Sequence, residues 1–277
     1  MTTPGYHRPR HWDQVHHSAV PGSPSLAARA LSTSVYDIVA GEVPADGTVV
    51  DIACGTGGLL RGLPAGPRAV GMDFSGEAVG LAAGSPGPGR GGGADWVRAD
   101  AHQLPLRGAS VDAVLCLAGV WVFADPARVL TEAFRVLRPG GVAVVHLWGS
   151  PADCRLITLG AVSVGQVVQG SRLTAGVTGP FELTPDRVDV WLRDAGFAPA
   201  DWRRSDLRLP MARPDDYWPE FAALAPTSYD HYRRAATGDR VQIRALLAGL
   251  LTASRRRAGD DSLSLSWLLG VARRAAG

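Results

Sequence analysis

Residues 48–58 read TVVDIACGTGG, an apolar and β-branched run that ends in an acid and passes directly into a glycine-rich turn. A short β-branched run bounded by turn residues is typical of a buried parallel strand. Glycines allow the sharp backbone bend that joins such a strand to a helix. This stretch therefore predicts a strand, a tight turn and a helix, the repeating unit of an open α/β sheet.

Further units of the same kind follow along the chain. Apolar runs predict strands at about 70–73, 95–99, 111–117, 142–147, 199–209 and 262–272, and periodic or capped segments predict helices at about 25–41, 75–83, 126–137, 184–195 and 213–258. Residues 84–93 are too rich in glycine for a regular element, and the pattern loosens in 151–180, which is rich in glycine, valine and threonine. The alternation predicts one domain, residues 1–277, with a doubly wound, mostly parallel, seven-stranded α/β sheet.

The acids beside the glycine-rich turn indicate its ligand. A dinucleotide-binding turn has the pattern G-x-G-x-x-G and holds a pyrophosphate, but the turn that begins at Gly55 lacks the third glycine. Asp51 ends the strand before the turn, and its charge about 4 Å from a pyrophosphate charge would cost roughly 4 kcal/mol at an effective dielectric near 20. It favours a cationic ligand, such as an α-amino group or a sulfonium. Asp73 ends the next strand, where a carboxylate can accept both hydroxyls of a ribose.

At these residues the sequence resembles the class I S-adenosylmethionine-dependent methyltransferases, particularly the small-molecule branch that includes the ubiquinone/menaquinone-type enzymes. Five motifs carry the resemblance in family order, at residues 49–57, 71–75, 98–105, 111–116 and 137–141. Each motif alone is weak, but the ordered set is specific. The resemblance implies a Rossmann-like methyltransferase fold whose cofactor-binding core is residues 48–150, with S-adenosyl-L-methionine as cofactor and S-adenosyl-L-homocysteine as product.

The resemblance also implies roles for single residues. Asp73 would hold the ribose and Phe74 would pack on the adenine, while Asp100 and the backbone of Ala101 would read the adenine amino edge. Ala53 stands where the broad family has its first glycine, a variation that the small-molecule branch tolerates. The complete implied cofactor set is Asp51, Ala53, Cys54, Gly55, Thr56, Gly57, Asp73, Phe74, Asp100, Ala101 and Leu117.

Methyl transfer from a sulfonium is an in-line displacement, so the protein must mainly hold the acceptor atom about 3–3.5 Å from the methyl carbon. A base is optional. His146, late on the fifth strand, and His16, in the N-terminal arm, are the candidate bases, although His146 could equally be a core histidine. The candidate acceptor wall is Tyr36, Trp121, Tyr217, Trp218 and His231.

Two segments outside the core are expected to cover the acceptor. Residues 1–30 form an N-terminal arm or lid, and residues 211–260 form the helical cap that this branch inserts between its sixth and seventh strands. The cap is rich in Trp, Tyr, Leu and Pro, which favours an apolar or aromatic acceptor. The expected function is methyl transfer to an O, N or C atom of such a metabolite, in bacterial secondary metabolism. Two alternatives stay open: cyclisation, elimination or rearrangement with the cofactor retained, and a non-enzymatic cofactor-sensing module.

Composition limits the partners. Arginine supplies all 28 basic residues against 26 acids, a net charge of +2 that gives no electrostatic footprint for nucleic acid. Three scattered cysteines suggest a reducing cytoplasm, and no apolar run approaches the roughly 18 residues that span a bilayer. The four histidines at 7, 11, 16 and 17 lack carboxylate or thiol partners, so no metal is expected. A monomer or homodimer that binds a small-molecule acceptor is therefore expected.

Overall fold

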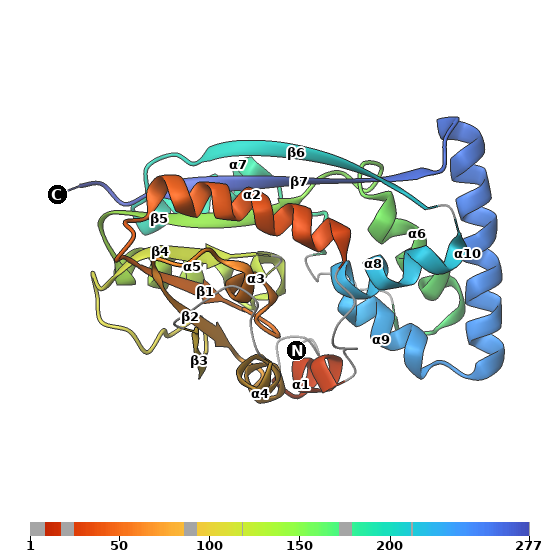
Figure 1. The fold of residues 1–277 in the computed structure, drawn as a ribbon, viewed down its shortest axis with the longest axis horizontal. Helices are drawn as coiled ribbons and strands as arrows, with labels where there is room; N and C mark the ends of the chain where they lie inside the picture. The colour runs from red at the N-terminus through yellow and green to blue at the C-terminus, as the bar shows by residue number, and fades with distance from the viewer. Residues whose placement is uncertain are drawn as a thin grey trace.

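The computed structural model describes residues 9–17, 25–85, 93–117, 119–171, 179–211 and 213–276. Its centre is one seven-stranded sheet in the order β3-β2-β1-β4-β5-β7-β6 (Figure 1). All neighbouring strands are parallel except β7, which runs antiparallel to both β5 and β6. The strands are β1 (Thr48–Ile52), β2 (Arg68–Asp73), β3 (Asp95–Arg98), β4 (Val111–Cys116), β5 (Leu137–Trp148), β6 (Asp201–Pro210) and β7 (Ser262–Arg273). The predicted fold class is confirmed.

Helices cover both faces of this sheet. They are α1 (Pro9–His17), α2 (Leu26–Glu42), α3 (Gly58–Gly62), α4 (Gly76–Gly84), α5 (Pro126–Val136), α6 (Arg155–Val167), α7 (Pro185–Ala195), α8 (Tyr217–Leu224), α9 (Pro226–Arg234) and α10 (Thr237–Ala258), with 3₁₀ turns η2 (Val120–Val122) and η3 (Pro214–Asp216). One buried core lies between the sheet and α2, α6 and the helices from α8 to α10, and a second lies against α5 and α7. Strands buried on both faces explain the uninterrupted apolar runs of the sequence.

Local signals place most helix starts correctly. Ser25, Ser75, Asp125 and Thr184 each accept a hydrogen bond from a backbone amide in the first turn of the helix that follows. Such side chains satisfy amides that have no partner within the helix. The helices predicted from these starts are confirmed to within two residues.

Helix α6 lies in 151–180, where no helix is predicted from the sequence. It carries Gly160, which weakens helix propensity. A Cβ at Gly160 would lie only 2.6 Å from the Tyr217 hydroxyl and 2.7 Å from a ring carbon of Phe221. The small residue is therefore required by packing against α8, and this tertiary contact stabilises a segment that its own sequence leaves undecided.

The segment between β6 and β7 forms a group of helices at the end of the sheet where α6 also lies (Figure 1). Glu220 of α8, whose side chain is buried, joins this group of helices to α2 by hydrogen bonds. One carboxylate oxygen accepts a hydrogen bond from the Leu26 amide at 2.8 Å, and the other accepts from the Ser25 hydroxyl at 2.6 Å and the Ala27 amide at 3.1 Å. A residue of the cap therefore closes the N-terminus of α2.

Candidate functional site

A cavity of about 2340 Å³ opens at the carboxyl ends of β1, β2 and β4, beneath α1, α2, α6, α8 and α9. The strand order reverses between β1 and β4, the place where open α/β sheets bind ligands. Of the cofactor-site residues predicted from the sequence, ten line the cavity: Asp51, Ala53, Cys54, Gly55, Thr56, Asp73, Phe74, Asp100, Ala101 and Leu117. The topology therefore gathers the ends of several strands into one site.

The glycine-rich turn has an unusual backbone. Gly55 and Gly57 have φ values of +54° and +77°, and Ala53 has φ +57°, a conformation that disfavours a side chain. Gly57 is absent from the cavity lining, and its contact with the cofactor stays a prediction. A Cβ there would lie 2.3 Å from the ring of Trp96, so the glycine makes room for the β3 tryptophan. The same ring also leaves no space for a side chain at Gly71.

Two acids stand where the turn begins. Asp73 accepts hydrogen bonds from the Gly55 and Ser75 amides, both at 2.8 Å, which fixes the position of its carboxylate. Asp51 is 3% exposed, and its burial, together with the charge of Asp73, raises its pKa well above the ordinary value. A buried acid held beside a second carboxylate is stabilised by a cation. This end of the cavity therefore fits a ligand that carries a positively charged group and a diol.

A third acid lies after β3. One oxygen of Asp100 accepts hydrogen bonds from the His102 amide at 2.9 Å and from His102 Nδ1 at 2.7 Å. Burial opposes ionisation of Asp100, but these bonds outweigh it and lower the pKa of the carboxyl group. The Asp125 amide donates to His102 Nε2 at 3.3 Å, which assigns the ring proton to Nδ1. His102 also lines the cavity, and sequence reasoning gave it no role.

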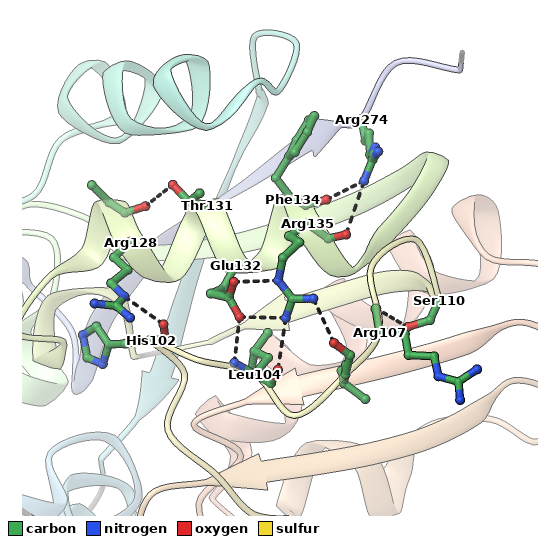
Figure 2. Close-up of polar contacts among 12 residues, drawn as sticks. His102, Leu104, Arg107, Ser110, Arg128, Thr131, Glu132, Phe134, Arg135 and Arg274 are labelled. Atoms are coloured by element: carbon green, nitrogen blue, oxygen red, sulfur yellow. Dashed lines mark hydrogen bonds and ion pairs between the residues drawn. The ribbon is translucent and has the colours of Figure 1, made fainter.

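A polar network fastens this segment to α5 (Figure 2). Glu132 accepts from the Leu104 amide at 2.8 Å, and Arg135 donates to the carbonyls of Leu104 and Leu106 at 3.0 and 2.9 Å. Arg128 Nε donates to the His102 carbonyl at 2.9 Å. The loop that carries Asp100 is thus held in place by a helix rather than left to move.

The N-terminal helix α1 borders the same site. Trp12, Val15 and His16 line the cavity, and Asp13 accepts hydrogen bonds from the Ser75 hydroxyl at 2.7 Å and the Glu77 amide at 3.2 Å, at the start of α4. A Cβ on Gly55 would lie 3.5 Å from His16 Cε1. Burial lowers the pKa of His16 in spite of the acids around it, which keeps the imidazole neutral.

The other candidate base lies elsewhere. His146 has no exposed surface and is absent from the cavity lining, so the prediction that it points toward the ligand edge is wrong. Burial lowers its pKa to about 3. Trp148 stands two residues further along the same face of β5, packs edge-on against the His146 ring with centroids 4.3 Å apart, and itself lines the cavity. Because a strand presents alternate residues to one face, the tryptophan occupies the position nearer the ligand edge.

The predicted acceptor wall is only partly assembled. Tyr36, Trp121 and Trp218 line the cavity, whereas Tyr217 and His231 do not. The Tyr217 hydroxyl accepts a hydrogen bond from the Gly160 amide at 2.7 Å in the core. Neighbouring residues on a helix point about 100° apart, and in α8 Tyr217 faces the core while Trp218 lines the cavity.

His231 lies where α9 packs against α1. Burial lowers its pKa, and it interacts electrostatically with the imidazole of His11. Residues missing from the predicted wall that do line the cavity include Trp12, Trp148, Tyr229, Asp230 and Arg244. No local pattern singles these out, because they come from four different helices and strands.

Two further features concern the described residues. They contain no group of three or more His, Cys, Asp or Glu side chains placed to hold a metal ion, and His7 of the N-terminal cluster lies outside them. They also contain no helix that is both long and apolar enough to cross a bilayer.

Comparison with known proteins agrees with the site. The family model described as a methyltransferase domain matches residues 50–145. A demethylmenaquinone methyltransferase of Clavibacter sepedonicus is 30% identical over 186 residues, which are 63% of this chain and 73% of the relative. A demethylmenaquinone methyltransferase of Thermus thermophilus is 37% identical over 147 residues, 52% of this chain and 66% of the relative.

Solved structures share the fold at lower identity. A SAM-dependent methyltransferase of Methanosarcina mazei has a TM-score of 0.52 at 17% identity and covers 87% of this chain and 98% of its own. The [4+2]-cyclase SpnF also has a TM-score of 0.52, at 20% identity, covering 88% of this chain and 82% of its own. These two neighbours show that the fold is common to proteins with different reactions.

Proposed function

This chain belongs to the class I S-adenosylmethionine-dependent methyltransferases, in the branch of the ubiquinone/menaquinone-type enzymes, and from that premise we propose that it methylates an O, N or C atom of an apolar or aromatic metabolite. The observation that carries the proposal is the joining of two chemistries in one cavity. The cavity holds the buried Asp51 beside Asp73, and aromatic side chains from several other elements also line it. A cationic cofactor and an apolar acceptor can therefore lie next to each other.

The residues present fit the cofactor, whose sulfonium supplies an activated methyl group. Asp51 would balance its positive charge, and Asp73, already oriented by two backbone amides, would accept the ribose hydroxyls. Phe74 would pack on the adenine, with Asp100 and the backbone of Ala101 at its edge, and Leu117 also lines the cavity. A bound cation would stabilise the ionised form of Asp51, which burial and the neighbouring Asp73 disfavour, so the site suits a positively charged ligand.

The remaining task of the protein is to place the acceptor and exclude water. Trp121, Trp148, Trp218 and Tyr229 supply aromatic walls from η2, β5, α8 and α9. Ligand pockets are commonly about 300–1,000 Å³, so a cavity of 2340 Å³ has room for the cofactor and a sizeable acceptor together. The relatives named as demethylmenaquinone methyltransferases support a ring-bearing, apolar acceptor.

His16 is the residue we assign to proton removal from an acidic acceptor. Its imidazole lies against the glycine-rich turn and is kept neutral by burial, the state in which it can take a proton. Proton removal and closure of the site would then depend on the same helix, α1.

We also infer a place in bacterial secondary metabolism and a cytoplasmic location, the latter because three scattered, unpaired cysteines are typical of a reducing compartment.

The test has two stages. Calorimetric titration with S-adenosylmethionine and S-adenosylhomocysteine measures cofactor binding, with Asp73→Ala as the matched variant that should bind weakly. Incubation with methyl-labelled cofactor and a panel of reduced naphthoquinones, phenols and extract from producing cells, followed by mass spectrometry, then identifies any labelled product. A labelled product that depends on Asp73 supports the proposal. Binding with no label in any acceptor favours cyclisation, elimination or rearrangement, and absence of binding refutes the cofactor assignment.

A further inference from the structure

Strand β6 forms one edge of the sheet, and Figure 1 shows no element beyond it. Within the described part of the chain, its backbone hydrogen bonds all go to β7. Nine of its ten residues are exposed or partly exposed, the exception being Leu209. An edge with free amides and carbonyls is a template for pairing with another strand.

Within each face of this strand the charges alternate in sign: Asp201 and Arg203 lie on one face, and Arg204, Asp206 and Arg208 on the other. Arg203 bonds to Asp201 at 2.9 Å and Arg204 to Asp206 at 2.8 Å, both within the strand, and Arg204 also bonds to Asp153 before α6 at 3.2 Å. Charged side chains can protect an edge from unwanted pairing. A row that carries both signs can also be complementary to itself, and the register decides between these outcomes.

A two-fold axis perpendicular to the sheet is the operation that pairs a strand antiparallel with its own copy. This rotation leaves the upper and lower faces of the sheet unexchanged, so a residue can lie opposite only a residue whose side chain is on the same face. The numbers of two such residues differ by zero or an even number. When Ser205 lies on the axis, Arg204 of each copy faces Asp206 of the other, and residues 201–209 all find partners. Moving the axis to the residue on either side places Arg204 opposite Arg204, or Asp206 opposite Asp206.

We propose that β6 pairs with β6 of a second copy of this chain, with Ser205 on the two-fold axis, so that one continuous sheet runs through a homodimer. The pairing satisfies the free backbone groups of the edge and doubles the Arg204–Asp206 contacts across the axis. It closes the assembly at two copies, because each copy uses its single free β6 edge. The cavity lies at the β1–β4 reversal, away from β6, so dimerisation does not depend on the proposed function.

Sedimentation velocity over a range of concentrations tests the association. Wild-type protein should form a dimer at high concentration. Arg204→Asp and Asp206→Arg should each weaken dimerisation by about tenfold or more, because each sets like charges opposite one another at two places. The double variant Arg204→Asp/Asp206→Arg should restore it. Arg107→Asp is the matched control, since Arg107 is exposed on the loop before β4, which β5 and β7 separate from β6, and should leave dimerisation unchanged.

Cross-linking tests the register. Facing residues on paired strands have Cβ atoms about 4.5–5.5 Å apart, so Ser205→Cys should form an intermolecular disulfide under mild oxidation. The native cysteines are buried and supply no competing surface thiol. Arg203→Cys, on the same face but four positions from its symmetry mate, should not cross-link. A protein that stays monomeric at all concentrations overturns the proposal, and equal cross-linking at 203 and 205 overturns the register.

Discussion

Replacing Glu220 with glutamine tests how the cap is held to the core. The wild-type carboxylate accepts three hydrogen bonds at the N-terminus of α2, at distances of 2.6, 2.8 and 3.1 Å. A glutamine that keeps its oxygen toward Ser25 and Ala27 must turn its NH₂ group toward the Leu26 amide, where two donors meet. The substitution therefore removes at least one hydrogen bond to a charged acceptor, about 1.5–3 kcal/mol. It also removes a negative charge from a helix N-terminus, about 0.5–1 kcal/mol.

The expected loss of unfolding free energy is about 2–4 kcal/mol, which corresponds to a fall in Tm of roughly 4–8 °C for a chain of this size. Urea and thermal unfolding measure it directly. Glu182→Gln is the matched control, because Glu182 is exposed, and it should change stability by less than about 0.5 kcal/mol. Because α8 carries Trp218 and α2 carries Tyr36 on the cavity wall, the variant should raise the acceptor KM more than the cofactor Kd. A Glu220→Gln protein as stable as the Glu182→Gln control would refute the anchoring role.

The remaining predictions concern the site. Asp73→Ala should weaken S-adenosylhomocysteine binding by about 1–3 kcal/mol through the lost ribose contacts, and an unchanged Kd in calorimetry would refute that role. Because Asp51 must lose its proton to balance a cation, and its pKa is raised, cofactor affinity should increase as pH rises through that pKa; Asp51→Asn should bind more weakly with no such dependence. His16→Ala should slow turnover by roughly 10²-fold with little effect on cofactor affinity, and activity equal to wild type would exclude it as the base. His146→Ala should instead leave kcat unchanged and lower stability by about 2 kcal/mol or more, because it creates a cavity in the core; a large fall in kcat at unchanged stability would return His146 to the site.

Local chemistry explains which features were predictable. The helix starts at Ser75, Asp125 and Thr184 depend on contacts within a few residues, so the sequence alone predicts them. The parallel strands bury both faces and therefore show as apolar runs. The acids at the ends of β1 and β2 follow the same logic, since each comes directly after a run of this kind. The sequence could therefore name ten residues that line this end of the cavity, and their contacts with a cofactor stay predictions.

The proposed acceptor end of the cavity could not be predicted from the sequence. Its walls come from α1, η2, β5, α8 and α9, whose meeting depends on the path of the whole chain. Between Tyr217 and Trp218, only the orientation of α8 decides which ring faces the cavity. His146 and Trp148 lie on the same face of β5, and the point at which the strand ends decides which of the two side chains reaches the cavity. His102 was overlooked because its role arises from Asp125, more than twenty residues away.

The sequence by itself determined the α/β class, the order of the elements and the acids that flank the glycine-rich turn, because these depend on periodicity and on neighbours along the chain. Only the tertiary structure decided that Gly160 of α6 packs against α8, that Gly57 leaves room for the ring of Trp96, and that α1 is held against the start of α4 through Asp13. The physical reason is the range of the interactions involved. Hydrogen-bonded caps and strand patterns act over a few residues, whereas side-chain packing and cavity walls join segments that meet only after the sheet has formed.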